Sequence, residues 1–373
     1  MPKRHRPGTS AASILRHVED IVLATSGEDA FELVYAVAAA RLVSKKQALG
    51  PAITEAGRRL ELGRIADRAL LARVDGILEG ALTDESVLDA IFESLVPRVA
   101  KADKGQYFTP RHVVDFIVRM VAPRPGELLV DPACGSGAFL SRARAFGART
   151  RGVDLDGRAV RVARLLAIAG GADAESVARA DGLQKESDLV PADKRALADV
   201  VATNPPFAGR AAADGFSVAD VVRTPERDVL FLERALDVLK PGGRLGIVLP
   251  YNKASGGAYA SMRRWLFERA RVLAVVGLPR ETFLPHTSQR TFVLFAQKRR
   301  SAKEIAQADE RTMFVISERA GKDTGGEPIH DATGKLDHDL DDVASELAPF
   351  LRAADFGREP KPRKAARLAE ASP

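Results

Sequence analysis

The chain has 373 residues, of which 46% are hydrophobic and 28% are charged. This length suggests two domains, or one large domain with extensions, and the composition excludes a low-complexity or intrinsically disordered protein. No apolar run is long enough to span a membrane, and the basic residues 1–10 lead into no apolar segment of the kind found in secretory signals. The single cysteine, Cys134, excludes a disulfide framework and a cysteine-ligated zinc cluster. We therefore expect a soluble, cytoplasmic protein without a metal site.

The net charge of +6 is concentrated at the two ends of the chain. Residues 1–10 carry three basic side chains, and residues 358–373 carry five basic and two acidic ones, so each end contributes +3 and the remainder is formally neutral. We expect these ends to be a flexible basic tail and a disordered basic tail. Enzymes that bind DNA unaided usually have a basic excess in the folded body. If DNA is the substrate, either the charge is segregated onto one face or a partner supplies it.

Residues 11–100 are expected to form a helical accessory or docking domain. Their apolar residues recur at helical spacing, and Gly50-Pro51 and Gly80 to Asp84 divide the run into separate helices. No catalytic constellation is present in this region. We expect its deletion, over roughly residues 11–95, to remove a docking surface and to leave ligand binding elsewhere largely intact.

The pattern changes after residue 127, where short apolar runs rich in β-branched residues alternate with amphipathic helical segments. Such alternation predicts a doubly wound α/β sheet, here with seven strands in a domain of residues 101–300. The last two runs are joined by a loop without a helix, which favours an antiparallel terminal hairpin. Residues 301–357 form an extension with one further strand-like run, Met313–Ser317, and a helix near Val343–Leu351. The seven runs are Leu128–Val130, Gly152–Val153, Val177–Ala180, Val200–Ala202, Leu245–Leu249, Val272–Val276 and Thr291–Ala296.

The first strand ends in a carboxylate that is followed by a glycine turn. Asp131 precedes a Gly-x-Gly turn, Gly135 to Gly137, which opens a helix. Such a turn allows close backbone approach to a ligand and directs N–H groups towards its anionic part. It is not the dinucleotide fingerprint G-x-G-x-x-G, and the carboxylate suits the amino acid end of S-adenosylmethionine better than a pyrophosphate. The alternative is a glycine-rich turn that binds nothing.

Two further aspartates lie at the ends of the next two strands. Asp154 follows the glycine turn by about 20 residues, where an acidic group can accept hydrogen bonds from ribose hydroxyls. The alternative role is a helix N-cap, which suits Asp156 better. Asp181 can accept from the exocyclic amine of an adenine ring or can simply cap a turn.

The fourth strand runs directly into Asn204-Pro205-Pro206-Phe207. Two successive prolines cannot extend a sheet, so the chain projects rigidly from the strand end. The Asn204 amide and the Pro205 carbonyl become fixed acceptors that can draw the lone pair of a conjugated nitrogen out of conjugation. The Phe207 ring can stack on a flipped base. A simple turn is the alternative.

With these motifs, roughly residues 100–330 resemble the class I S-adenosylmethionine-dependent methyltransferases, and within them the N6-adenine DNA methylases. The nearest likeness is to the modification subunit of type I restriction–modification systems. The segment Lys104 to Pro110 is similar to that family's GQ-aromatic-aromatic-TP signature, which covers the cofactor. The resemblance implies a Rossmann-like sheet, with cofactor contacts from Gln106, Tyr107, Phe108, Thr109, Asp131, Ala133, Gly135, Gly137, Asp154, Asp181 and Asn204, and a catalytic motif of Asn204, Pro205, Pro206 and Phe207.

The resemblance implies methyl transfer to N6 of adenine in DNA after base flipping. Only Ala208–Arg227 separates the catalytic motif from the next helix, and about 70 residues follow residue 300, too few for a target-recognition domain. We therefore expect a separate specificity subunit as partner, together with a second copy of the chain or a restriction subunit. The alternatives are a methyltransferase of protein glutamine, an RNA base or a small molecule, and a non-catalytic cofactor-binding scaffold. The Gln106–Pro110 segment favours DNA, and the intact motifs argue against a scaffold.

Overall fold

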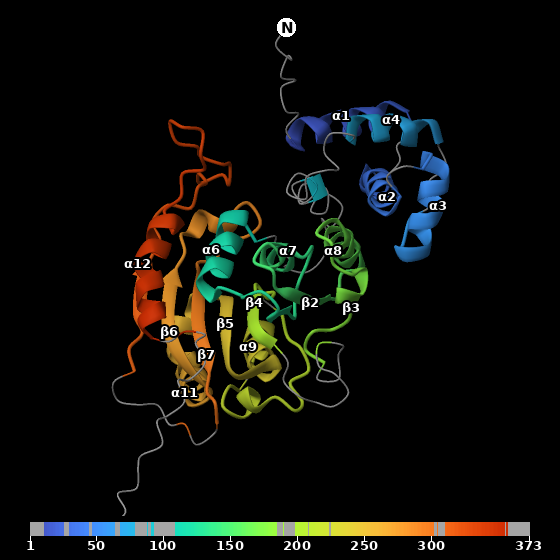
Figure 1. Cartoon of the computed structure of the whole chain (residues 1–373). Helices are drawn as coiled ribbons and strands as arrows, with labels where there is room; N and C mark the ends of the chain where they lie inside the picture. The colour runs from blue at the N-terminus through green and yellow to red at the C-terminus, as the bar shows by residue number, and fades with distance from the viewer. Residues whose placement is uncertain are drawn as a thin grey trace, which may run out of the picture.

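An eight-stranded sheet with the order β3-β2-β1-β4-β5-β7-β6-β8 forms the centre of the protein (Figure 1). In the computed structural model the described residues are 11–25, 30–44, 47–63, 68–78, 88, 91–92, 109–184, 189, 198–207, 209–223, 225–301, 304, 310–354 and 356. The strands are β1 (Leu128–Asp131), β2 (Arg149–Asp154), β3 (Val177–Arg179), β4 (Ala198–Thr203), β5 (Leu239–Pro250), β6 (Ala270–Gly277), β7 (Thr291–Lys298) and β8 (Met313–Ile316).

The pairing of the strands confirms the predicted doubly wound sheet with an antiparallel terminal hairpin. β1 to β5 are mutually parallel, whereas β7 runs antiparallel to both β5 and β6. The sheet has eight strands where seven were predicted, because the strand-like run at Met313–Ile316 joins β6 in parallel as β8. β5 begins at Leu239, directly after the preceding helix, and includes Pro241, Gly242 and Gly243.

Alternating side chains along the strands supply two apolar faces, each covered by helices. On β5, Val248 packs with α6 (Arg111–Val121), α7 (Ala138–Arg144) and α12 (Leu340–Ala353). Its neighbours Ile247 and Leu249 pack on the opposite face with α9 (Arg227–Val238) and α11 (Ala260–Arg269). The sheet therefore forms the middle layer of three, and its strand ends are free to carry functional loops.

The N-terminal helices pack onto the sheet domain through α8 (Gly157–Ala169), as Figure 1 shows. They are α1 (Ala11–Thr25), α2 (Ala30–Val43), α3 (Leu49–Arg59) and α4 (Arg68–Leu78). Arg161 of α8 donates to both carboxylate oxygens of Glu32 at 2.7 Å each, and its guanidinium lies 4.3 Å from the centre of the Tyr35 ring. Gly50-Pro51 lies in the first turn of α3, where proline is tolerated because no N–H is needed there.

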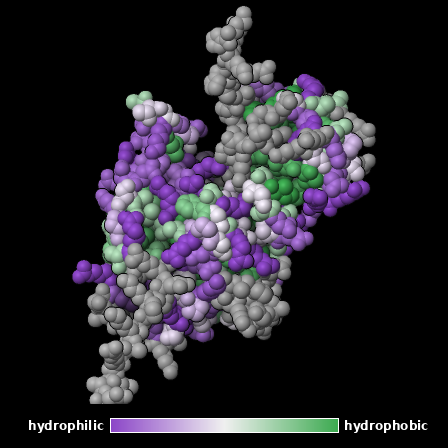
Figure 2. All heavy atoms as spheres, viewed as in Figure 1, coloured by the Kyte–Doolittle hydropathy of each residue, from purple (hydrophilic) through white to green (hydrophobic). Residues whose placement is uncertain are grey.

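Some expectations fall on residues outside the described ranges. These are residues 1–10, the expected helix break at Gly80 to Asp84, and residues 358–373. Among the described residues, none of the helices combines the length and apolar character needed to cross a membrane. Hydrophilic residues dominate the surface of the segment that protrudes before α12 (Figure 2). Asp323 and Glu327 are exposed residues of this segment.

Candidate active site

The predicted site residues converge because β1, β2 and β4 are parallel neighbours whose carboxyl ends meet at one edge of the sheet. Asp131 ends β1, Asp154 ends β2, and Asn204 follows β4 directly. Ligands of open α/β sheets bind at this edge, in the crevice beyond the strand ends. The topology therefore gathers side chains from three separate motifs into one region.

Asp131 is a fully buried carboxylate whose hydrogen bonds are incomplete. Its Oδ1 atom accepts from the Ala133 N–H at 3.0 Å. Its Oδ2 atom is buried and, within the described part of the chain, has no hydrogen-bond partner. Burial raises the pKa of Asp131 to about 7, although the neighbouring Thr203 hydroxyl and the Ala133 N–H act in the opposite direction. A buried acceptor with an unused oxygen is suited to a cationic or amino group of a ligand.

Asp154 holds the glycine turn in place. Its Oδ2 accepts from the Gly135 N–H at 2.8 Å, and its Oδ1 accepts from the Asp156 N–H at 2.9 Å. Burial raises the pKa of Asp154, against the effect of these N–H groups. Asp156 caps α8 by accepting hydrogen bonds from the N–H groups of Arg158 and Ala159. This is the helix N-cap role that the sequence predicted for Asp156.

The glycine turn requires left-handed backbone. Gly135 has φ +52° and Gly137 has φ +89°. A Cβ atom at Gly137 would lie 3.0 Å from Ala163 Cβ in α8, whereas one at Gly135 would meet nothing within 4 Å. The Gly137 position is therefore fixed by packing, and Gly135 leaves open space where a ligand can approach the backbone.

Asp181 caps the turn that follows β3. Its Oδ1 accepts from the Leu183 N–H at 3.0 Å. Gly182 was missed as a site residue, yet a Cβ atom there would lie 1.9 Å from the Pro132 carbonyl oxygen. The segment after β3 thus packs directly on the loop after β1, a contact for which the Asp-Gly dipeptide was the only sequence signal.

Asn204 is positioned by a residue from the segment that precedes α6. Its Nδ2 donates to the Thr109 hydroxyl at 2.9 Å. Its Oδ1 atom is buried without a hydrogen-bond partner among the described residues, as is the neighbouring Thr203 hydroxyl. The Phe207 ring is buried and meets the Phe283 ring edge-on, with 5.7 Å between the ring centres. The motif thus presents an oriented amide oxygen beside an aromatic pair.

Three predicted cofactor residues, Gln106, Tyr107 and Phe108, lie outside the described residues. Thr109, the last of that segment, is the one that the structure brings to Asn204. Ala133 contributes its N–H to Asp131. Cys134 is buried, and a Cβ atom added at Gly152 would lie 2.8 Å from the Cβ atom of Cys134. The small side chain of Cys134 therefore packs directly against β2.

The sheet order and the motifs at its carboxyl edge define a class I methyltransferase fold. A chain from Listeria monocytogenes, described as a proposed class I S-adenosylmethionine-dependent methyltransferase, superposes with a TM-score of 0.62 at 15% identity, covering 91% of this chain and 97% of that one. The modification subunit of a proposed type I restriction enzyme from Vibrio vulnificus YJ016 superposes with a TM-score of 0.63 at 17% identity, covering 92% and 90%. Both likenesses concern the fold.

Residues 83–345 match the family described as N-6 DNA Methylase, and the chain belongs to this family. The methylase subunit of the type I restriction enzyme StySPI from Salmonella potsdam is 32% identical over 232 residues, which are 56% of this chain and 44% of that subunit. The chain spans about half the length of the curated relatives that it matches.

Proposed function

We propose that this chain transfers a methyl group from S-adenosylmethionine to N6 of adenine in DNA, as the catalytic subunit of a restriction–modification-type system. Family membership supports the reaction class. The observation that carries the proposal is Asn204, whose buried Oδ1 has no partner in the described chain while its Nδ2 is fixed by Thr109. An oriented acceptor of this kind is what an exocyclic amine requires.

The residues at the carboxyl edge fit S-adenosylmethionine. The unused Asp131 Oδ2 would accept a hydrogen bond from the methionine amino group. The open space at Gly135 would let the ligand approach the turn, and Asp154 would accept from the ribose hydroxyls. Asp181 would face the adenine ring of the cofactor, and Gln106 to Thr109 would cover it. When bound, S-adenosylmethionine supplies an electrophilic methyl group on its sulfonium sulfur.

Two acceptors would activate the target nitrogen. Adenine N6 carries two protons, and its lone pair is conjugated with the ring, so the free base is a poor nucleophile. Asn204 Oδ1 and the Pro205 carbonyl would accept hydrogen bonds from the two N6–H groups and so turn the lone pair out of the ring plane. The Phe207 ring, supported by Phe283, would stack on the flipped base, which must leave the duplex to reach this edge.

Sequence recognition is proposed to come from a separate specificity subunit. Sequence-specific DNA interfaces commonly bury about 1,000–2,500 Å² of protein surface. The formally neutral body and the short segment after the catalytic motif do not suit such an interface. The matched relatives are named methylase subunits of type I restriction enzymes, which supports a multi-subunit assembly.

Methylation-sensitive sequencing tests this proposal directly. The purified chain with S-adenosylmethionine is expected to place N6-methyladenine in DNA slowly and at no defined motif. Addition of its specificity partner is expected to give complete methylation of one motif. Asn204→Ala is the inactive control for contaminating methylases. Methylation of a glutamine-containing peptide or of RNA in preference to DNA would replace the proposed substrate. One motif methylated to completion by the chain alone would refute the requirement for a partner.

A further inference from the structure

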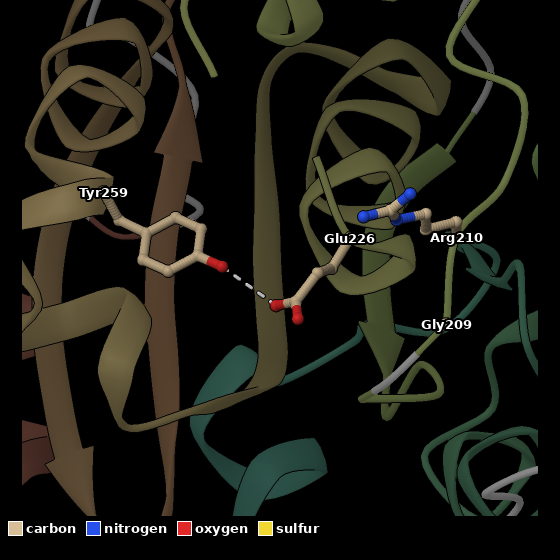
Figure 3. A pocket seen from close by; sticks show the side chains of 4 residues that line it. All are labelled: Gly209, Arg210, Glu226 and Tyr259. Carbon is tan, nitrogen blue, oxygen red and sulfur yellow. Dashed lines mark hydrogen bonds between the residues drawn. The ribbon is translucent and has the colours of Figure 1, made fainter. Parts of the chain in front are cut away.

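A pocket of about 310 Å³ opens beside the catalytic motif and is lined by Gly209, Arg210, Glu226 and Tyr259 (Figure 3). Gly209 and Arg210 follow β4 and the catalytic motif, and Tyr259 ends the short 3-10 helix Gly257–Tyr259 in the connection between β5 and α11. Because β4 and β5 are parallel neighbours, both loops leave the sheet at the edge that carries Asn204. The pocket volume is comparable to that of a single nucleotide, within the range of small-ligand sites.

One wall of the pocket is a fixed carboxylate. Glu226 Oε2 accepts from the Tyr259 hydroxyl at 2.9 Å and forms an ion pair with Lys253. Lys253 is buried and also lies 3.1 Å from Asp228. Burial opposes ionisation of Glu226, but hydrogen bonds from Lys253 and Tyr259 keep its pKa below the ordinary value. This wall therefore presents an ionised acceptor that cannot swing away.

The opposite wall carries a free cation. The Arg210 side chain is exposed and, in the described part of the chain, makes no hydrogen bond or ion pair. Figure 3 shows Arg210 on the side of Glu226 away from Tyr259. An isolated antiparallel bridge between Arg210 and Glu226 holds the two backbones together. The pocket thus has donors on one side and an acceptor on the other.

We propose that this pocket holds the nucleotide next to the target adenine, with Arg210 on its phosphate and Glu226 on the amino group of its base. The guanidinium matches a phosphate in a bidentate manner, and a carboxylate accepts from the amino group of cytosine. Arg210 is three positions after Phe207, a reach of at most about 11 Å, which limits the contact to a neighbouring nucleotide. This inference rests on the proposed function and adds a preference for an amino-bearing flanking base.

The test uses the full chain saturated with S-adenosylhomocysteine and short duplexes in which the target adenine is unpaired, since this removes the cost of flipping. Affinity is measured by fluorescence anisotropy at several salt concentrations. Each phosphate beside the adenine is replaced in turn by an uncharged methylphosphonate, and each flanking base is varied between cytosine and thymine. Arg149→Ala, at the far end of β2, is the charge-matched control for Arg210→Ala. Glu268→Gln, at the exposed end of α11, is the matched control for Glu226→Gln.

Arg210→Ala is expected to weaken binding at least about tenfold and to lower the salt slope by about 1. A methylphosphonate at one flanking position should weaken DNA binding by the unmodified protein and should not change DNA binding by Arg210→Ala. Glu226→Gln should abolish the preference for cytosine over thymine at the flanking position, whereas Glu268→Gln should retain it. If the unmodified protein methylates adenine in a parallel assay with S-adenosylmethionine but Arg210→Ala binds DNA as Arg149→Ala does, the pocket inference is overturned and the proposed function stands. If the unmodified protein, together with its specificity partner and S-adenosylmethionine, neither binds nor methylates these duplexes, both are overturned.

Discussion

The Asn204 amide donates a hydrogen bond to the Thr109 hydroxyl at 2.9 Å across 95 residues of sequence. This contact uses the nitrogen side of the amide and leaves Oδ1, which is buried, for a substrate. The residue expected to cover the cofactor and the residue expected to contact the target nitrogen are therefore directly connected. Binding at one of them can be transmitted to the other through a single hydrogen bond.

Asn204→Ala is expected to lower the rate of methyl transfer by a factor on the order of 10² or more, with cofactor affinity near normal, because it removes a positioned polar contact. Thr109→Val is expected to lower the methylation rate by a smaller factor, because it only removes the hydrogen bond that orients the Asn204 amide. Thr109→Ser keeps the hydroxyl and should methylate at the rate of the unmodified protein. Incorporation of labelled methyl groups into adenine-containing DNA gives the rate, and calorimetry gives the cofactor affinity. Full turnover by Asn204→Ala would place the chemistry elsewhere.

Cofactor affinity is expected to rise with pH between about 6 and 8. Burial raises the pKa of Asp131 to about 7, and only its ionised form can pair with a methionine ammonium group. Asp131→Asn should bind more weakly and lose this pH dependence. Calorimetric titrations of S-adenosylmethionine across this pH range provide the measurement. Equal pH profiles for the two proteins would mean that Asp131 does not meet the ammonium group.

The same residue is expected to reduce stability at neutral pH. The native carboxyl binds its proton more tightly than the unfolded one, so its contribution to the free energy of unfolding falls as the pH rises from about 4 to 7. Asp131→Asn should therefore be more stable than the unmodified protein at pH 8 and similar at pH 4. Urea unfolding at both pH values tests this, and a destabilised Asp131→Asn at pH 8 would contradict it.

Gly137→Ala is expected to destabilise the protein by more than Gly171→Ala and to weaken cofactor binding. Both glycines have positive φ, but a Cβ atom at Gly171 would meet nothing within 4 Å, whereas one at Gly137 would lie 3.0 Å from Ala163 Cβ. Gly171→Ala thus measures the backbone strain alone, about 1–2 kcal/mol. Thermal unfolding and calorimetry compare the two variants. Equal losses of stability in the two variants would show that α8 can move away from the added Cβ atom without an energetic cost.

Deletion of residues 11–95 is now expected to impair the sheet domain and not only partner docking. Val162, Leu165 and Leu166 of α8 are fully buried in a cluster shared with the N-terminal helices. Glu32→Gln offers a milder test, because it leaves Arg161 without its ion pair and should lower the free energy of unfolding by about 1–3 kcal/mol. A truncated protein with normal thermal stability and cofactor affinity would show that the helices are an independent module.

The sequence alone determined the sheet and the position of its motifs. Periodicity and β-branched composition located all seven expected strands, and the missing helix between the last two indicated their antiparallel pairing. Because parallel strands end at a common edge, the placement of Asp131, Asp154 and Asn204 at strand ends already predicted that they would meet.

Only the tertiary structure decided the burial, the pKa and the hydrogen-bond partners of these residues. The pKa of Asp131 depends on burial by elements distant in sequence, and the orientation of Asn204 depends on a partner 95 residues away. β8 is a four-residue edge strand with alternating exposure, too weak a pattern for certain assignment before its pairing with β6 is known. Local patterns specify secondary structure, but burial, unused hydrogen-bonding capacity and the pocket at Arg210 arise from packing between segments, which a linear pattern does not contain.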